Sequence, residues 1–146
     1  MAHPLRPEVH AGSAFIWDAE MRLLIIEDSP LVRRMYGLAF SRRDHDLVEV
    51  ENGLQALDAL AGASEPFDVI LLDLRMPDMD GPTFLRTLRR TALFRDIPII
   101  VTTAEPESSE LLQEARTLGI DGVVKKPWTP HELLRLVESV QRPEKS

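Results

Sequence analysis

Polar side chains that can bind cations or phosphate follow four of the short apolar runs in this sequence. They are the acidic pair Glu27 and Asp28, the single acid Asp73, the hydroxyl pair Thr102 and Thr103, and the basic pair Lys125 and Lys126. Apolar runs without polar alternation are typical of strands covered on both faces, as in parallel sheets. The carboxyl ends of such strands meet at one edge of the sheet, where ligands bind. We therefore expect three acids, a hydroxyl and an ammonium group to converge there.

This set of side chains suits the transfer of a phosphoryl group with the help of magnesium. Three crowded carboxylates repel one another and require a cation, and an all-oxygen ligand set favours Mg²⁺ over zinc. A bound divalent ion offsets the charge of an incoming phosphoryl group and leaves one carboxylate free to attack phosphorus. Lysine and threonine side chains can hold the phosphoryl oxygens. Asp73 is the expected nucleophile, and an acyl phosphate on its side chain is the expected product.

The spacing of apolar residues predicts five strand–helix units between residues 21 and 142. Four short apolar runs are predicted strands: Leu23–Ile26, Val69–Leu72, Ile97–Val101 and Val123–Val124. A fifth and weaker apolar run, Leu47–Val50, is also a predicted strand. Helical periodicity separates these runs, and glycines fall near the boundaries of the periodic segments. Alternating strands and helices predict a doubly wound α/β domain with a five-stranded parallel sheet and helices on both faces.

Two of the predicted helices carry clear local signals. In the first helix, Leu31, Met35 and Leu38 share one apolar face. Before the last helix, Thr129 and Glu132 match a capping box, in which each side chain bonds the backbone N–H of the other residue.

The composition limits the function classes. The chain has 146 residues, of which 44% are hydrophobic and 28% charged, and this balance fits one globular domain. Its net charge of −7 argues against direct binding of nucleic acid. The absence of cysteine excludes disulfides, thiolate zinc sites and a cysteine nucleophile. No apolar run is long enough for a membrane span or a secretory signal, so we expect a cytoplasmic location and no membrane partner.

Four motifs in order along the chain resemble the receiver domain of bacterial two-component response regulators. The run from Leu23 to Ser29 is similar to the first strand and acidic pair of that family, and the run from Asp73 to Gly81 is similar to its phosphoacceptor strand and following loop. Thr103-Ala104 matches the switch hydroxyl and its small neighbour, and Lys126-Pro127 matches the lysine that precedes a proline. The resemblance covers residues 21 to 142 and implies a flavodoxin-like strand order, 2-1-3-4-5.

The resemblance also implies a role for each site residue. Asp73 would accept a phosphoryl group from a sensor histidine kinase or a phosphotransfer protein and thereby switch the conformation of the domain. Asp28 and Asp73 would bind Mg²⁺ directly, with Glu27 more remote and the carbonyl of Arg75 completing the ligand set. The phosphate contact would be Lys126, whose bond to the following proline is often cis in the family. By this resemblance the chain is a signalling domain that catalyses its own phosphorylation and dephosphorylation, rather than a classical enzyme.

The sequence departs from the family pattern in places that affect the output more than the chemistry. Val123 stands where the family usually has an aromatic residue. This leaves open simple strand packing or a relay through backbone shifts near Thr103. Arg75 and Glu105 lie two residues after Asp73 and Thr103 respectively, and they either pair across the site and alter the lifetime of the acyl phosphate or are merely solvated.

Several alternatives stay open at this stage. Lys125 is a second candidate for the phosphate contact, and Pro127 is the candidate cis-proline. A phosphohydrolase with an aspartyl-phosphate intermediate and an unphosphorylated binding module are the competing functions. We expect an effector to bind the fourth and fifth helices.

Two segments flank the predicted domain. We expect residues 1–20 to be a flexible or loosely docked N-terminal extension and residues 143–146 to be a short C-terminal tail. This tail is too short for an output domain. A single-domain regulator and a receiver excised from a longer chain therefore both remain open.

Overall fold

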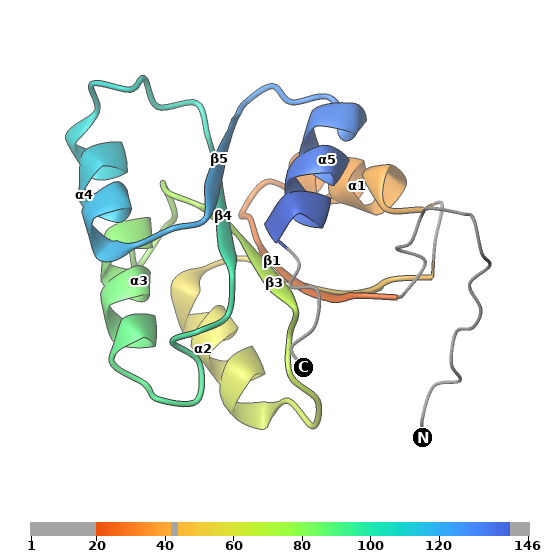
Figure 1. Cartoon of the computed structure of the whole chain (residues 1–146), viewed down its shortest axis with the longest axis horizontal. Coiled ribbons are helices and arrows are strands. Elements are labelled where there is room, and N and C mark those ends of the chain that lie inside the picture. Colours follow the sequence, from red (N-terminus) through yellow and green to blue (C-terminus); the bar gives the residue numbers. More distant parts are fainter. Residues whose placement is uncertain (1–19, 42–43, 141–146) are drawn as a thin grey trace.

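The computed structural model describes residues 20–41 and 44–140 and shows a five-stranded α/β domain (Figure 1). In chain order its elements are β1 Arg22–Ile26, α1 Pro30–Ala39, β2 Asp46–Val50, α2 Gly53–Gly62, β3 Val69–Asp73, α3 Gly81–Arg89, β4 Ile99–Thr103, α4 Glu110–Leu118, β5 Gly122–Lys125 and α5 Pro130–Val140. All neighbouring strands are parallel, in the order β2-β1-β3-β4-β5. This confirms the predicted fold class and strand order. The predicted N-terminal extension, except for Glu20, and the predicted C-terminal tail lie outside the described residues.

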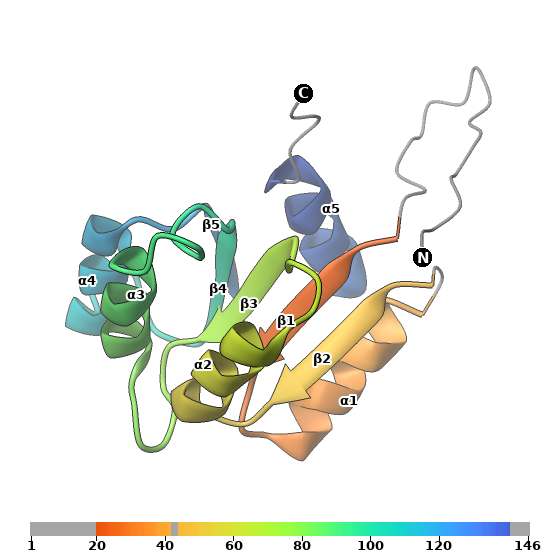
Figure 2. The ribbon, with the colours of Figure 1, turned by 90° about the horizontal axis from the view of Figure 1, so that it is seen from below.

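The sheet separates two hydrophobic cores. One core joins α2, α3 and α4 to one face of the sheet, and the other joins α1 and α5 to the opposite face. Figures 1 and 2 show this division, with α1 and α5 together on one side of the strands. Every residue of β3 and β4 is buried because helices cover both faces, whereas β2 lies at the edge and alternates toward solvent. None of the helices in the described part of the chain is long and apolar enough to cross a bilayer.

Helix α1 buries a different face from the one that the sequence suggested. Leu31 is 66% exposed and Leu38 is 70% exposed, whereas Tyr36 and Ala39 are buried. Two apolar stripes run along this helix, and periodicity alone does not decide between them. The helix docks through the stripe that contains Tyr36, whose hydroxyl has a hydrogen-bond partner inside the domain. Of the predicted face Leu31, Met35 and Leu38, only Met35 packs against the core, so the prediction was wrong for Leu31 and Leu38.

The predicted capping box is confirmed at the start of α5. The Thr129 hydroxyl accepts a hydrogen bond from the Glu132 N–H at 3.1 Å, and the Glu132 carboxylate accepts one from the Thr129 N–H at 3.0 Å. These two bonds satisfy backbone donors that the first turn of a helix leaves free. They fix the start of α5 at Pro130, four residues after Lys126.

Gly81 allows helix α3 to dock against the loop that follows β3. A Cβ atom at this position would lie 2.9 Å from the Leu74 Cα and 2.6 Å from its Cδ2 atom. The Gly81 N–H donates a hydrogen bond to the Leu74 carbonyl at 2.9 Å. This close approach ties α3 to the residue directly after Asp73, so a side chain at Gly81 would disturb the loop beside the acidic residues.

We predict that Gly81→Ala lowers the free energy of unfolding by about 1–3 kcal/mol, because the backbone of Leu74 must move to admit the methyl group. Gly37→Ala is the matched control, since a Cβ atom there meets nothing within 4 Å and Gly37 lies inside α1. The control should raise the free energy of unfolding by about 0.5–1 kcal/mol. Urea unfolding of both variants measures the difference, and equal effects at the two positions would contradict the packing argument.

Candidate functional site

Three carboxylates meet where β1 and β3 end. Ile26 pairs with Leu72 in the parallel register, so Glu27 follows β1 at the level where Asp73 closes β3. Carboxylate oxygens of Glu27, Asp28 and Asp73 all lie within 4.8 Å of one another. Glu27 is 1% exposed and Asp73 is 6% exposed, whereas Asp28 is open to solvent. The sheet thus places two buried acids and one exposed acid around a single point.

Lys126 is the cation that contacts these acids. Its Nζ atom lies 3.0 Å from Glu27 Oε1 and 3.4 Å from Asp73 Oδ2. The peptide bond from Lys126 to Pro127 is cis. Lys125 has different partners, because its Nζ atom donates to the Glu105 carbonyl at 2.7 Å and lies 3.5 Å from a carboxylate oxygen of Glu107. Of the two lysines, it is therefore Lys126 that the fold brings to the carboxylates.

The charges in this site are unevenly offset. Burial raises the pKa of Asp73 to about 6, the nearby Glu27 carboxylate adds to this shift, and Lys126 offsets only part of it. Burial alone would lower the pKa of Lys126, but attraction to Asp73 and Glu27 outweighs it and the pKa is raised. One ammonium group thus faces two buried carboxylates. An additional cation would stabilise the ionised form of Asp73.

Backbone donors fix the orientation of the two buried acids. The Ser29 N–H donates to Glu27 Oε2 at 3.2 Å, and the Arg75 N–H donates to Asp73 Oδ1 at 3.3 Å. The Arg33 guanidinium donates to the Glu27 carbonyl at 2.7 Å and so secures the turn after β1. The carboxylates therefore belong to a rigid part of the fold.

The hydroxyl of Thr103 is engaged by its own loop. It accepts a hydrogen bond from the Glu105 N–H at 3.0 Å, and Thr103 is buried at the end of β4. The side chain of Glu105 forms a hydrogen-bonded ion pair with Arg75, which follows β3. This pair joins the loops after β3 and β4 next to the carboxylates. Ala104 is exposed directly after β4, and Val123 is half-buried in β5 against the core beneath α4.

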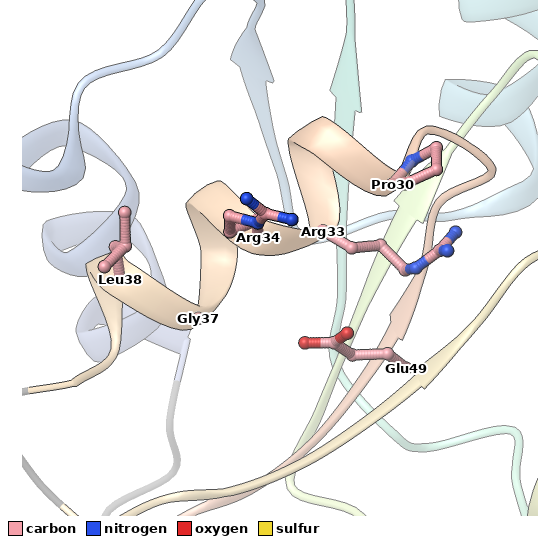
Figure 3. Close-up of a pocket in the computed structure, with 6 residues that line it drawn as sticks. All are labelled: Pro30, Arg33, Arg34, Gly37, Leu38 and Glu49. Atoms are coloured by element: carbon pink, nitrogen blue, oxygen red, sulfur yellow. The ribbon is translucent and has the colours of Figure 1, made fainter.

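A cleft opens beside the carboxylates. It has a volume of about 320 Å³ and is lined by Asp28, Arg75, Met76, Pro77, Asp80 and Leu111. A second hollow, of about 460 Å³, lies on the outer side of α1 between that helix and β2 (Figure 3). Its lining includes Arg34, Leu38 and Glu49 but none of the three clustered acids. Of the residues that sequence spacing singled out, Asp28 and Arg75 line the first cleft.

Sequence reasoning missed one residue that the fold places close to the acids. Tyr36 in α1 is 1% exposed, and its hydroxyl donates to the Thr102 hydroxyl at 2.9 Å. The Glu27 and Asp73 carboxylates are near enough to raise its pKa further after the effect of burial. The only signal in the sequence was a single tyrosine within an otherwise aliphatic stripe.

The sequence matches a known family over most of its length. A model of the response regulator receiver domain matches residues 23–138. A chemotaxis CheY homologue from Campylobacter jejuni is 32% identical over 121 residues, which cover 82% of this chain and 92% of that protein. The phosphate regulon transcriptional regulator PhoB of Klebsiella pneumoniae is 34% identical, and the match covers 83% of this chain. It covers 52% of PhoB, so the chain spans about half the length of that relative.

Solved structures agree with this assignment. A chemotaxis CheY protein from Vibrio cholerae has a TM-score of 0.75 at 30% identity. That match covers 84% of this chain and 99% of the Vibrio cholerae protein. The receiver domain of a sensor histidine kinase from Pseudomonas aeruginosa, solved with magnesium coordinated in its active-site cleft, has a TM-score of 0.74 at 26% identity. That match covers 83% of this chain and 97% of the other. The chain belongs to the response regulator receiver family of two-component signalling. These relatives favour neither the phosphohydrolase nor the unphosphorylated binding module.

The crowding of buried acids leads to a prediction about stability. Asp73→Asn removes one of two buried carboxylates and leaves Lys126 paired with Glu27, so it should raise the free energy of unfolding by about 1–2 kcal/mol without divalent cations. Asp58→Asn in α2, at an exposed position, is the control and should change it by less than about 0.5 kcal/mol. Urea unfolding at neutral pH measures both. A less stable Asp73→Asn protein would show that the carboxylates are not in conflict.

Proposed function

We propose that this receiver domain accepts a phosphoryl group on Asp73 and signals the event to a separate partner. One observation carries the proposal: a buried aspartate closes the central strand, held between a lysine and two further acids. The donor would be a sensor histidine kinase or a phosphotransfer protein, in keeping with the family. The effector would bind α4 and α5, and the domain would act in the cytoplasm.

The donor set suits Mg²⁺ as the cofactor. Glu27, Asp28 and Asp73 provide only oxygen ligands, and the raised pKa of Asp73 indicates that a cation is favoured there. Asp28 and Asp73 would hold the ion, with Glu27 more remote and the Arg75 carbonyl as a further ligand. A bound Mg²⁺ would offset negative charge on the transferring phosphoryl group.

Three side chains would carry out the transfer of the phosphoryl group: those of Asp73, Lys126 and Thr103. A carboxylate oxygen of Asp73 attacks phosphorus, the new P–O bond forms as the bond to the donor breaks, and the donor group departs with the bonding electrons. Lys126, 3.4 Å from Asp73 Oδ2, would hold one phosphoryl oxygen. The Thr103 hydroxyl would bind another after exchanging its bond to the Glu105 N–H. That exchange would be the first step of the conformational switch.

We predict that the protein takes up one phosphoryl group per chain from acetyl phosphate, and only when Mg²⁺ is present. Intact mass spectrometry measures the product. Asp73→Asn should show no uptake because the nucleophile is lost, whereas Asp58→Asn in α2 should behave as the unaltered protein. Uptake that persists in Asp73→Asn would refute the proposal. Continuous turnover of phosphate esters, with no protein-bound phosphoryl group, would indicate the phosphohydrolase.

The ion pair between Arg75 and Glu105 bears on the lifetime of the acyl phosphate. Arg75 follows β3 and Glu105 follows β4, so their contact joins the loops after these two strands, and Arg75 also lines the cleft that contains Asp28. Arg75 is exposed, and such a pair contributes little to stability. Its position suits a different task, namely restricting the approach of water to phosphorus and so slowing hydrolysis of the acyl phosphate that the domain itself catalyses.

We predict that Arg75→Ala and Glu105→Ala each shorten the lifetime of the acyl phosphate several-fold, and that the double variant is no faster than the faster single one. The double variant would add nothing because either change alone breaks the same contact. Loss of phosphate from purified phosphoprotein measures the lifetime. Arg86→Ala is the matched control, since Arg86 forms a comparable exposed ion pair with Glu114 between α3 and α4. Lifetimes unaltered in both single variants would remove the idea.

A further inference from the structure

Tyr36 is a buried side chain with a titratable group that lies close to the carboxylates and that the proposed chemistry does not use. It lies in α1, on the face that packs against the sheet, and is the only tyrosine of the chain. Burial raises its pKa, so the hydroxyl keeps its proton and acts as a donor. A buried hydroxyl in an otherwise apolar core calls for a specific partner.

That partner is the end of β4. The Tyr36 hydroxyl donates to the Thr102 hydroxyl at 2.9 Å, and Thr102 is fully buried. Thr102 pairs with Asp73 on one side and with Val124 on the other in the parallel register. The bond therefore reaches a residue that lies beside the proposed phosphoacceptor and directly before Thr103.

The ring of Tyr36 contacts a second part of the site. Its centroid lies 4.9 Å from that of Trp128, with the two rings tilted by 32°. Trp128 is buried and stands two residues after Lys126, in the loop between β5 and α5. Stacked aromatic pairs at this distance restrain each other. One side chain of α1 thus touches both segments that carry the phosphate-binding groups.

We propose that Tyr36 is a positioning residue for phosphoryl transfer to Asp73. Its hydroxyl holds the end of β4, and with it Thr103, while its ring holds the loop that carries Lys126. This inference rests on the proposed function. It adds a residue from a helix that contributes no group to the reacting centre, and it assigns a purpose to a buried polar bond between α1 and the sheet.

The geometry explains why the hydroxyl matters more than the bulk of the ring. Neighbouring residues of a strand point to opposite faces, so Thr102 is directed toward α1 when Thr103 is directed the other way. A bond that fixes Thr102 therefore also fixes the direction of Thr103. A ring without the hydroxyl would fill the same volume and leave that direction free. The proposed magnesium ligands follow β1 or end β3, and they do not depend on this bond.

The test removes each hydroxyl without changing the shape of the core. Tyr36→Phe, Thr102→Val and the double variant are compared in the Trp17→Phe protein, in which Trp128 fluorescence alone reports magnesium binding. With acetyl phosphate at saturating Mg²⁺, each single variant should accept the phosphoryl group about fivefold more slowly, as expected for one lost hydrogen bond. The double variant should be no slower than the singles, and the affinity for Mg²⁺ should stay within about twofold.

Two control variants separate positioning from general damage. Leu38→Ala changes an exposed side chain of α1 that lines the hollow between this helix and β2 (Figure 3). Phe40→Leu enlarges free space in the same core, where Phe40 packs edge-on against His45. Both controls should accept the phosphoryl group at the unaltered rate.

The outcomes are distinct. A folded Tyr36→Phe protein that reacts at the unaltered rate overturns the proposal, and so do controls that are slowed as much as the hydroxyl variants. If Tyr36→Phe does not fold, Thr102→Val decides by the same criteria. Failure of the unaltered protein to accept any phosphoryl group would instead refute the proposed function itself.

Discussion

The site depends on two carboxylates held close together inside the protein. Glu27 and Asp73 are both buried, and a single ammonium group, that of Lys126, lies between them. Like charges at this separation repel strongly where water cannot screen them. The fold tolerates this repulsion because Glu27 directly follows β1 and Asp73 is the last residue of β3, and neither strand can easily move. The repulsion makes the site favourable for a cation and for the chemistry that a cation permits.

The sheet supplies the rigidity that this arrangement needs. β3 and β4 are buried along their whole length, and their parallel register fixes Asp73 against Thr102. The loops beyond these strands are joined by the ion pair of Arg75 and Glu105, in which the Arg75 side chain is exposed. A rigid proposed nucleophile between loops that can adjust is the arrangement expected of a domain that must react at one point and change shape at another.

Much of this could be predicted from the sequence because strand ends are easy to locate. Apolar runs that stop at an acid or a lysine placed Glu27, Asp28, Asp73 and Lys126 on one edge of the sheet, and the structure brings all four together. The face that α1 buries was not predictable, since its two apolar stripes are similar and the choice depends on a partner distant in sequence. The same limit hid Tyr36, because a bond to Thr102 spans 66 positions of the chain.

The two neighbouring threonines at the end of β4 would join the proposed reaction to the conformational response. Thr103 is held by the N–H of Glu105, and Thr102 is held by the hydroxyl of Tyr36. Both bonds exist while Asp73 is unmodified, so a pull on Thr103 toward the site acts against both. Because the strand has little freedom to bend between adjacent residues, any movement of Thr103 must also strain the bond to α1. In this chain, where Val123 offers no aromatic ring in β5, the bond from Tyr36 to Thr102 links α1 directly to the strand on which the proposed switch would pull.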